Sequence, residues 1–108
     1  MDEAKALQDY VLSDTAASSD HNAKINAAAR LMTGRAYPEC IQAYAAIANA
    51  HPEELGLCEA QIGAAYFFLG QYENAISFYQ SAERNGADAR MMKFNLDEAT
   101  AELKKHAR

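Results

Sequence analysis

Residues 59–82 read EAQIGAAYFFLGQYENAISFYQSA, and this stretch decides the fold. Small side chains at Gly63 and Ala75 stand among large apolar ones such as Ile62 and Tyr79. Small residues let two helix axes approach closely, and the large residues fill the space beside the contact. The stretch therefore predicts two antiparallel helices joined by a tight turn.

The same pattern recurs upstream at an offset of 35 residues. A repeat of this length predicts stacked helical hairpins, a fold class that usually binds other proteins. The upstream residues Tyr37, Cys40, Ile41, Tyr44 and Ile47 correspond in order to Tyr72, Ala75, Ile76, Tyr79 and Ala82.

Composition supports one all-α domain. The chain has 108 residues, is 50% hydrophobic, and contains only 5 Gly and 2 Pro. It has no apolar run long enough to span a membrane, and its acidic start, MDEAKALQDY, does not resemble a secretory signal. A formal net charge of −5 argues against nucleic acid as the main partner. We expect a cytoplasmic protein.

Cysteine and histidine usage argues against an enzyme. Cys40 and Cys58 are too few for a disulfide scaffold and are expected as free thiols, Cys40 as a small core residue. His21, His51 and His106 have no acid or Cys partner at a spacing that builds a catalytic dyad. No metal-binding motif and no Gly-rich phosphate loop occurs, so neither a metal nor a cofactor is expected.

The N-terminal region predicts a short helix and a linker. Apolar residues at helical spacing mark residues 3–13, and the Ser- and Asp-rich stretch SDTAASSDHN follows. Ser19 or Asp20 is expected to cap the next helix. The first helix, with Tyr10 outside the repeat pattern, either packs back over the array or docks on a second molecule, which would give a homodimer.

Five further helices are expected. Gly34 should end the first of them, Tyr37 and Pro38 should open the second, and Asp88 should cap the last. The last carries one apolar stripe of Met92, Leu96, Ala99 and Leu103. The expected ranges are about 21–33, 37–51, 57–69, 72–85 and 88–105.

The chain resembles the tetratricopeptide repeat (TPR) family, whose repeat follows the pattern W-x2-L-G-x2-Y…A-x3-F…P. The second repeat matches it as Glu59-x2-Ile62-Gly63-x2-Tyr66 and then Ala75-x3-Tyr79, without the Trp and the final Pro. The first repeat matches through Cys40-x3-Tyr44 and Pro52. Its first helix is degenerate, since Ala28 stands for the Gly and one extra residue separates Gly34 from Tyr37. The expected organisation is an N-terminal helix and linker over 1–20 and a TPR-like domain over 21–108, with repeats at 21–54 and 56–87 and a capping helix at 88–106.

The resemblance implies a right-handed superhelical stack, with a concave groove lined by the first helix of each repeat. We interpret the groove as an apolar site for a peptide or helix of a partner protein. Phe67 is a candidate anchor; the alternative is that Phe67 and Phe68 pack between neighbouring hairpins. The predicted groove residues are Asn22, Asn26, Ala29, Ala60, Ala64, Phe67, Met91 and Asn95.

Three functions remain open. The first is a non-enzymatic interaction module or adaptor. The second is an assembly subunit whose apolar surface is used in self-association. The third is a chaperone-like binding protein, because the chain resembles the small acidic repeat chaperones of type III secretion translocators. A clamp for a partner's C-terminal carboxylate is not expected, because Ala60 and Ala64 stand where polar donors would be needed.

Overall fold

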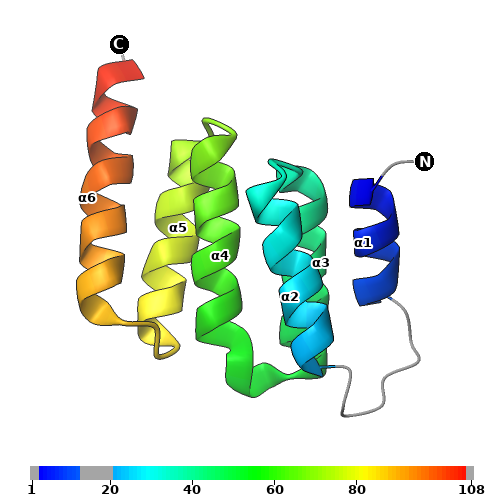
Figure 1. Ribbon diagram of the computed structural model, residues 1–108. Coiled ribbons are helices and arrows are strands. Elements are labelled where there is room, and N and C mark those ends of the chain that lie inside the picture. The colour runs from blue at the N-terminus through cyan, green and yellow to red at the C-terminus, as the bar shows by residue number, and fades with distance from the viewer. Residues whose placement is uncertain (1–2, 13–20, 107–108) are drawn as a thin grey trace.

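The computed structural model describes residues 3–12 and 21–106, and this part of the chain is all-α, without strands. The prediction of an all-α fold is therefore confirmed for these residues, while the Ser19 or Asp20 cap lies outside them. The helices are α1 (Glu3–Leu12), α2 (His21–Thr33), α3 (Tyr37–Ala50), the short 3-10 helix η2 (Pro52–Glu54), α4 (Leu55–Phe68), α5 (Tyr72–Arg84) and α6 (Ala89–His106) (Figure 1).

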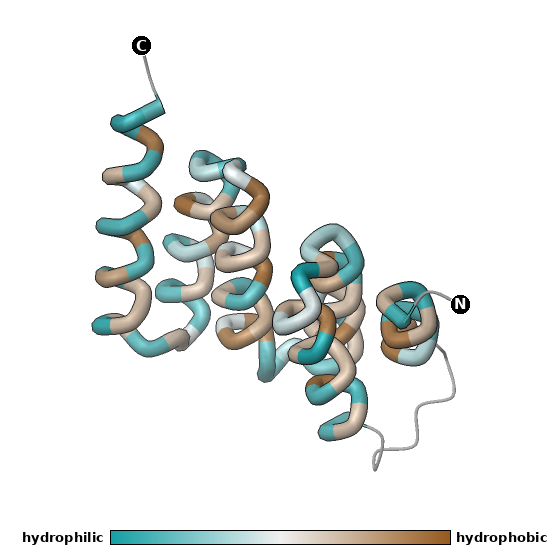
Figure 2. Tube along the Cα trace, turned by 45° about the horizontal axis from the view of Figure 1, so that its top comes forward, coloured by the Kyte–Doolittle hydropathy of each residue, from teal (hydrophilic) through white to brown (hydrophobic). Residues whose placement is uncertain are grey.

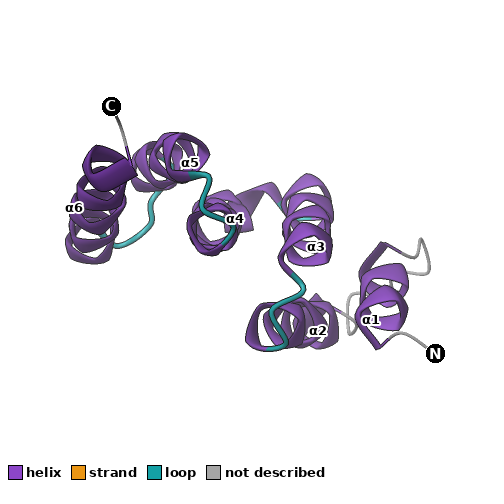
Figure 3. Cartoon of the chain, turned by 90° about the horizontal axis from the view of Figure 1, so that it is seen from above, coloured by secondary structure: helices purple, strands orange, loops and turns teal. Residues whose placement is uncertain are grey.

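The helices form a zigzag when viewed from above, with α2, α4 and α6 on one side and α3 and α5 on the other (Figure 3). Consecutive helices pack on one another, and α4 also contacts α6. Helix α1 packs on both α2 and α3, where Val11 is buried. In this structure the N-terminal helix therefore packs back on its own chain, which is one of the two arrangements expected for it.

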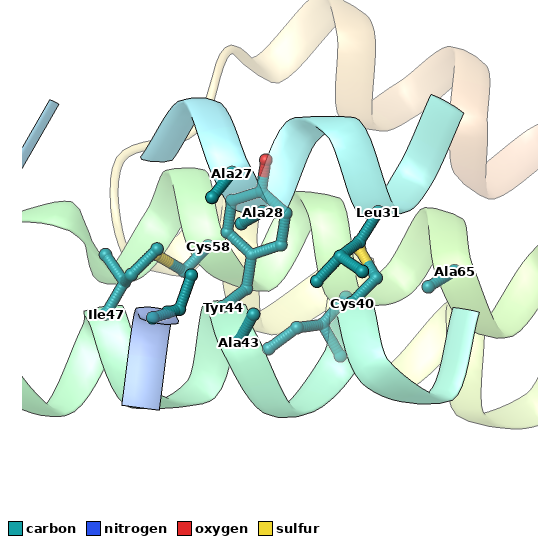
Figure 4. Packing of buried hydrophobic residues seen from close by; sticks show 11 residues of the cluster. Ala27, Ala28, Leu31, Cys40, Ala43, Tyr44, Ile47, Cys58 and Ala65 are labelled. Carbon is teal, nitrogen blue, oxygen red and sulfur yellow. The ribbon is translucent and has the colours of Figure 1, made fainter. Parts of the chain in front are cut away.

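Two clusters of buried residues hold the array together. The larger spans α1 to α4, and the smaller joins α5 and α6 to one side of α4. Tyr44 lies in the middle of the larger cluster, between α2 residues Ala27 and Ala28 and the Cys58 side of α4 (Figure 4). Because α2, α3 and α4 all contribute to this cluster, the two hairpins share one core.

The turns of the two hairpins are equivalent at the 35-residue offset. The N–H of Arg35 donates to Met32 O at 3.0 Å, and that of Gly70 donates to Phe67 O at 3.0 Å. Both turn residues have positive φ, 63° at Arg35 and 79° at Gly70. The extra residue inferred in the first turn is therefore wrong, because Arg35, and not Gly34, takes the place of Gly70.

Arg35→Gly should stabilise the protein by about 0.5–1 kcal/mol. A residue with a side chain loses about 1–2 kcal/mol of stability when its backbone is left-handed, and glycine avoids this loss. The larger conformational entropy of glycine in the unfolded chain offsets part of the improvement. Urea unfolding followed by circular dichroism measures the change. The matched substitution Gly70→Ala should destabilise by about 1 kcal/mol. Loss of stability in Arg35→Gly would contradict the equivalence of the two turns.

Helix α4 begins two residues earlier than expected, at Leu55, because η2 leads directly into it. Its first turn lies close to the end of α5, where a Cβ atom on Gly56 would sit 2.5 Å from Asn85 O. Glu59, at the place of the missing family Trp, accepts hydrogen bonds from Ser81 Oγ and Asn85 Nδ2, both at 2.7 Å. A polar clamp therefore joins α4 to α5 at this end.

Helix α6 is the last of the described helices and packs on α5. The carboxylate of Asp88 accepts a hydrogen bond from the Met91 N–H at 2.9 Å, which caps the helix. Met92 and Ala99 are buried against α5, and the side chains of Lys93 and Asp97 form an ion pair at 3.5 Å on the exposed side. Polar and apolar residues alternate around this helix (Figure 2). Within the described ranges, no helix combines the length and hydropathy required to cross a bilayer.

Buried thiols and phenols make stability fall at high pH. Burial raises the pKa of Cys40 to about 12 from 9.0, of Cys58 to about 11 from 9.0, and of Tyr44 and Tyr79 to about 12 from 10.0. The folded state holds these protons more tightly than the unfolded chain does. The contribution of the four groups to the free energy of unfolding is therefore fully present below their unfolded pKa values, and it is lost as pH rises toward the folded values.

We therefore expect the free energy of unfolding to decrease between pH 9 and 11, the interval that begins at the unfolded thiol value. The slope should approach about 1.4 kcal/mol per pH unit for each group that titrates in the unfolded chain alone. Urea unfolding at a series of pH values measures it. Cys40→Ala should remove one group's share of the slope, and an unchanged pH profile in that variant would contradict the assignment.

Candidate protein-binding surface

Helix α4 has one packed side and one side that no other helix covers. The buried residues on the packed side, which face α3 and α5, are Gly56, Cys58, Ile62, Gly63 and Ala65. At helical spacing, the row on the other side is Leu57, Gln61, Ala64 and Phe68.

Helices α2 and α6 lie on the same side of the array as α4, and each carries residues at positions that correspond to this row. On α2 the residues 35 positions before Leu57, Gln61 and Ala64 are exposed. On α6 the row of Met91, Asn95 and Glu98 lies beside the stripe buried against α5, and Phe94 borders this row on the side away from the stripe. We call these three rows together the first-helix strip, and its residues are Asn22, Asn26, Ala29, Leu57, Gln61, Ala64, Phe68, Met91, Phe94, Asn95 and Glu98.

Large apolar side chains are exposed along the strip. Relative exposure is 46% for Leu57, 59% for Phe68, 62% for Met91 and 67% for Phe94. The last two are the most exposed large apolar residues in the described part of the chain. Helices α4 and α6 contact each other, so these residues lie on neighbouring helices of the same side of the array (Figure 3).

The structure places the eight predicted groove residues in two groups. Six lie on the first-helix strip, either exposed or half-buried, and they come from all three helices. Ala60 and Phe67 instead pack against the cluster that joins α5 and α6. The exposed four are Asn22, Asn26, Ala29 and Met91, and the half-buried four are Ala60, Ala64, Phe67 and Asn95.

Phe67 and Phe68 occupy different environments. Phe67 is half-buried, with its ring centroid 5.4 Å from Tyr72 in an edge-on contact. Phe68 is more exposed, and one face of its ring stacks on Tyr37 of the first hairpin at 5.4 Å. Phe68 therefore contacts the neighbouring hairpin and still has surface exposed for a partner. Phe67 instead packs against the buried cluster that joins α5 and α6.

The strip is acidic at its α6 side. Glu98 lies one turn after Asn95 on α6, and Asp88 stands just before the helix, where its carboxylate caps the Met91 N–H. Neither carboxylate forms an ion pair within residues 3–12 and 21–106. Glu102, one turn farther on, is paired with Lys105 at 2.9 Å, and this hydrogen bond lowers the pKa of the Glu102 carboxyl.

A hollow of about 700 Å³ lies away from the strip, between the α4–α5 turn and the end of α6. Tyr72 and His106 stack at 5.6 Å beside it, and Leu103 and Glu73 line it. It is an open depression, and its polar lining residues Gln71, Glu73 and Asn74 are all exposed.

The two internal histidines meet where the hairpins join. The rings of His21 and His51 lie 3.7 Å apart, and each has a glutamate neighbour, Glu54 at 3.4 Å and Glu53 at 3.1 Å respectively. Sequence spacing did not show the contact of His21 with Glu54, which the tertiary packing of the chain brings together. The nearby Cys58 thiol stays protonated, because burial raises its pKa to about 11.

No three His, Cys, Asp or Glu residues are arranged to hold a metal ion among the residues that the structure describes. Cys40 and Cys58 are both free and buried, as expected. Their raised pKa values disfavour the reactive thiolate.

Sequence reasoning missed Leu57 and Phe94. Leu57 was taken as the start of the helix, and Phe94 lay between the residues assigned to the apolar stripe and the groove. A signal for Leu57 existed, because it lies outside the buried positions of α4 and 35 residues after the exposed Asn22. Phe94 has no such counterpart, since the 34-residue offset between α4 and α6 pairs it with the half-buried Ala60. Large apolar residues at positions that packing does not use indicate a contact surface.

Comparison with known proteins gave no match to a family model, to a curated protein or to a solved structure.

Proposed function

We propose that this protein is a non-enzymatic interaction module that binds a peptide or helix of a partner protein along the first-helix strip. The observation that carries the proposal is the exposure of Leu57, Phe68, Met91 and Phe94 on one side of the array. Large apolar side chains that stay exposed together on one side of a folded chain mark interaction sites. A rigid helical scaffold presents them with little ordering cost.

The TPR-like superhelical stack is part of this proposal. The equivalent turns at Arg35 and Gly70 support it, as do the shared positions of Tyr44 and Tyr79, both buried. A regular hairpin repeat gives curvature and a concave side, on which the first helices of the repeats lie. The polar outer face of α6, with its Lys93–Asp97 pair, suits a helix that ends such an array.

The partner should contact amide and apolar groups together. Asn22, Asn26 and Gln61 supply hydrogen-bonding side chains on α2 and α4, and Phe68, Met91 and Phe94 supply apolar area on α4 and α6. Aromatic and Met side chains carry much of the binding energy at protein interfaces. We therefore expect Phe94 and Phe68 to be the anchors.

The double variant Ala64→Glu with Phe94→Ala should lose partner capture by at least about tenfold, since a buried charge and a lost anchor each cost more than about 1 kcal/mol. Affinity purification from the source organism, with identification and binding measurement of the recovered protein, provides the readout. Ala45→Glu introduces the same charge at an exposed position of α3 and should leave binding and helicity unchanged. Full binding by the double variant would refute the proposal.

Self-association is the competing function, because the same exposed aromatic residues would suit a second copy. Light scattering across concentrations separates the two. A monomer at high concentration supports the partner-binding proposal, and a dimer that Phe94→Ala dissociates supports self-association.

A further inference from the structure

The turn that ends α5 carries the only Asn-Gly pair of the sequence, Asn85-Gly86. The other five asparagines are each followed by Ala or Leu. Because glycine has no Cβ, the backbone nitrogen after Asn85 is open to approach by the asparagine side chain. Both residues are exposed, and a Cβ atom on Gly86 would meet nothing within 4 Å. The pair therefore meets the steric conditions under which an asparagine amide reacts with the next backbone nitrogen.

The turn is a Schellman motif, in which Gly86 has a positive φ of 98°. The N–H of Gly86 donates to Glu83 O at 3.2 Å, and that of Ala87 donates to Ala82 O at 2.9 Å. Asn85 precedes the glycine with φ −100° and ψ 20°. Because this turn is the exposed end of a helix, it opens more readily than the array unfolds. Such an opening frees the Gly86 nitrogen.

The Asn85 side chain is a hydrogen-bond donor in the polar clamp between α4 and α5. Its Nδ2 donates to Glu59 Oε1 at 2.7 Å, to Ser81 O at 3.0 Å and to Ser81 Oγ at 3.3 Å. The Ser81 hydroxyl in turn donates to the other carboxylate oxygen of Glu59 at 2.7 Å. All three partners of the Asn85 nitrogen are acceptors, so a carboxylate in place of this amide could not form these bonds.

We propose that Asn85 is a site of spontaneous deamidation, and that the product opens the polar clamp. The backbone nitrogen of Gly86 attacks Cγ of Asn85, so that a nitrogen–carbon bond forms and the Cγ–Nδ2 bond breaks. Ammonia leaves with the proton of the Gly86 N–H, and a cyclic imide remains. Water then opens the imide at either carbonyl, which yields aspartate or isoaspartate. The net reaction turns asparagine and water into the acid and ammonia, without oxidation or reduction.

Both products disturb the joint between α4 and α5. A carboxylate at position 85 would face the carboxylate of Glu59, and like charges at this distance repel each other. The charge would also lie at the carboxyl end of α5, where the helix dipole disfavours it. Isoaspartate lengthens the backbone by one carbon atom beside Gly56, where a Cβ atom would already sit 2.5 Å from Asn85 O.

The first experiment follows the reaction in the full-length protein. The folded protein is kept at mildly alkaline pH for several weeks and digested in acid, where imide formation is slow. Mass spectrometry then measures the conversion of amide to acid at each asparagine. Asn85 should convert several-fold faster than any of the other five. Conversion at Asn85 that is no faster than at the others overturns the proposal.

The second experiment measures the effect on stability with Asn85→Asp, which reproduces one product. Its equilibrium constant for unfolding in urea should rise about tenfold, as expected when a hydrogen bond to a charged group is lost. Asn74→Asp is the matched control, because it places the same charge in the exposed first turn of α5, where the helix dipole favours it. It should change the constant by less than about twofold.

A double variant separates loss of the clamp from the general effect of a new charge. Adding Glu59→Gln to Asn85→Asp exchanges donor and acceptor, because the new amide can donate to the new carboxylate and still accept from Ser81. The double variant should be more stable than Asn85→Asp alone. An Asn85→Asp protein as stable as the parent, or one that Glu59→Gln does not rescue, overturns the proposed opening of the clamp. The clamp joins α4 to α5 and contains no residue of the first-helix strip, so none of these outcomes decides the proposed function.

Discussion

Gly56→Ala should destabilise the protein by about 2–3 kcal/mol, although the same change inside an ordinary helix gains up to about 1 kcal/mol. The new Cβ would lie 2.5 Å from Asn85 O and 3.1 Å from Ala87 N. Both are backbone atoms at the end of α5, so they have no rotamer through which to move away. The two helices must separate, which also disturbs the hydrogen bonds of Glu59.

The measurement is urea unfolding followed by circular dichroism. Leu57→Ala, in the next position, removes an exposed side chain and should change stability by no more than about 0.5 kcal/mol. Gly63→Ala is expected to cost less than Gly56→Ala, because its Cβ would meet the ring of Tyr79, which can shift. A neutral or stabilising Gly56→Ala would show that α4 and α5 do not approach as closely as described.

Tyr44→Ala should cost about 3–5 kcal/mol, the range for removing a buried aromatic side chain. Tyr44 is 3% exposed and lies where α2, α3 and α4 meet. Because a domain of this size has only about 5–15 kcal/mol of stability, the variant should be largely unfolded at 37 °C.

Thermal unfolding by circular dichroism provides the measurement for Tyr44→Ala. Tyr10→Ala is the matched control, because that side chain is 40% exposed on α1, and it should shift the midpoint by only a few degrees. An equal effect of both substitutions would contradict the shared core of the two hairpins.

The helices were predictable because their signals are local. Pro38 at the start of α3, Gly86 with φ 98° after α5 and the Asp88 cap each fix an end through the backbone of a few residues. The start of α4 was missed because the Pro52–Glu54 turn continues into it without a break. Arg35 was missed because sequence favours glycine at positive φ, and only the hydrogen bonds of the turn identify the residue that adopts it.

The candidate surface was predictable only in part. Periodicity assigns residues to faces of one helix, but the face that remains free depends on where the neighbouring helices pack. Phe67 and Phe68 differ by 100° around α4, and the position of α5 and α6 decides that Phe67 is covered while Phe68 is not. The contact of His21 with Glu54, 33 residues away, arises from tertiary packing in the same way.

Hydrogen exchange of the free protein and of its complex with the recovered partner tests the central claim most directly. The account predicts new protection in peptides covering 57–68 and 91–98, with little change in the exposed faces of α3 and α5. Protection confined to α3 and α5, or to the hollow beside Tyr72 and His106, would contradict it.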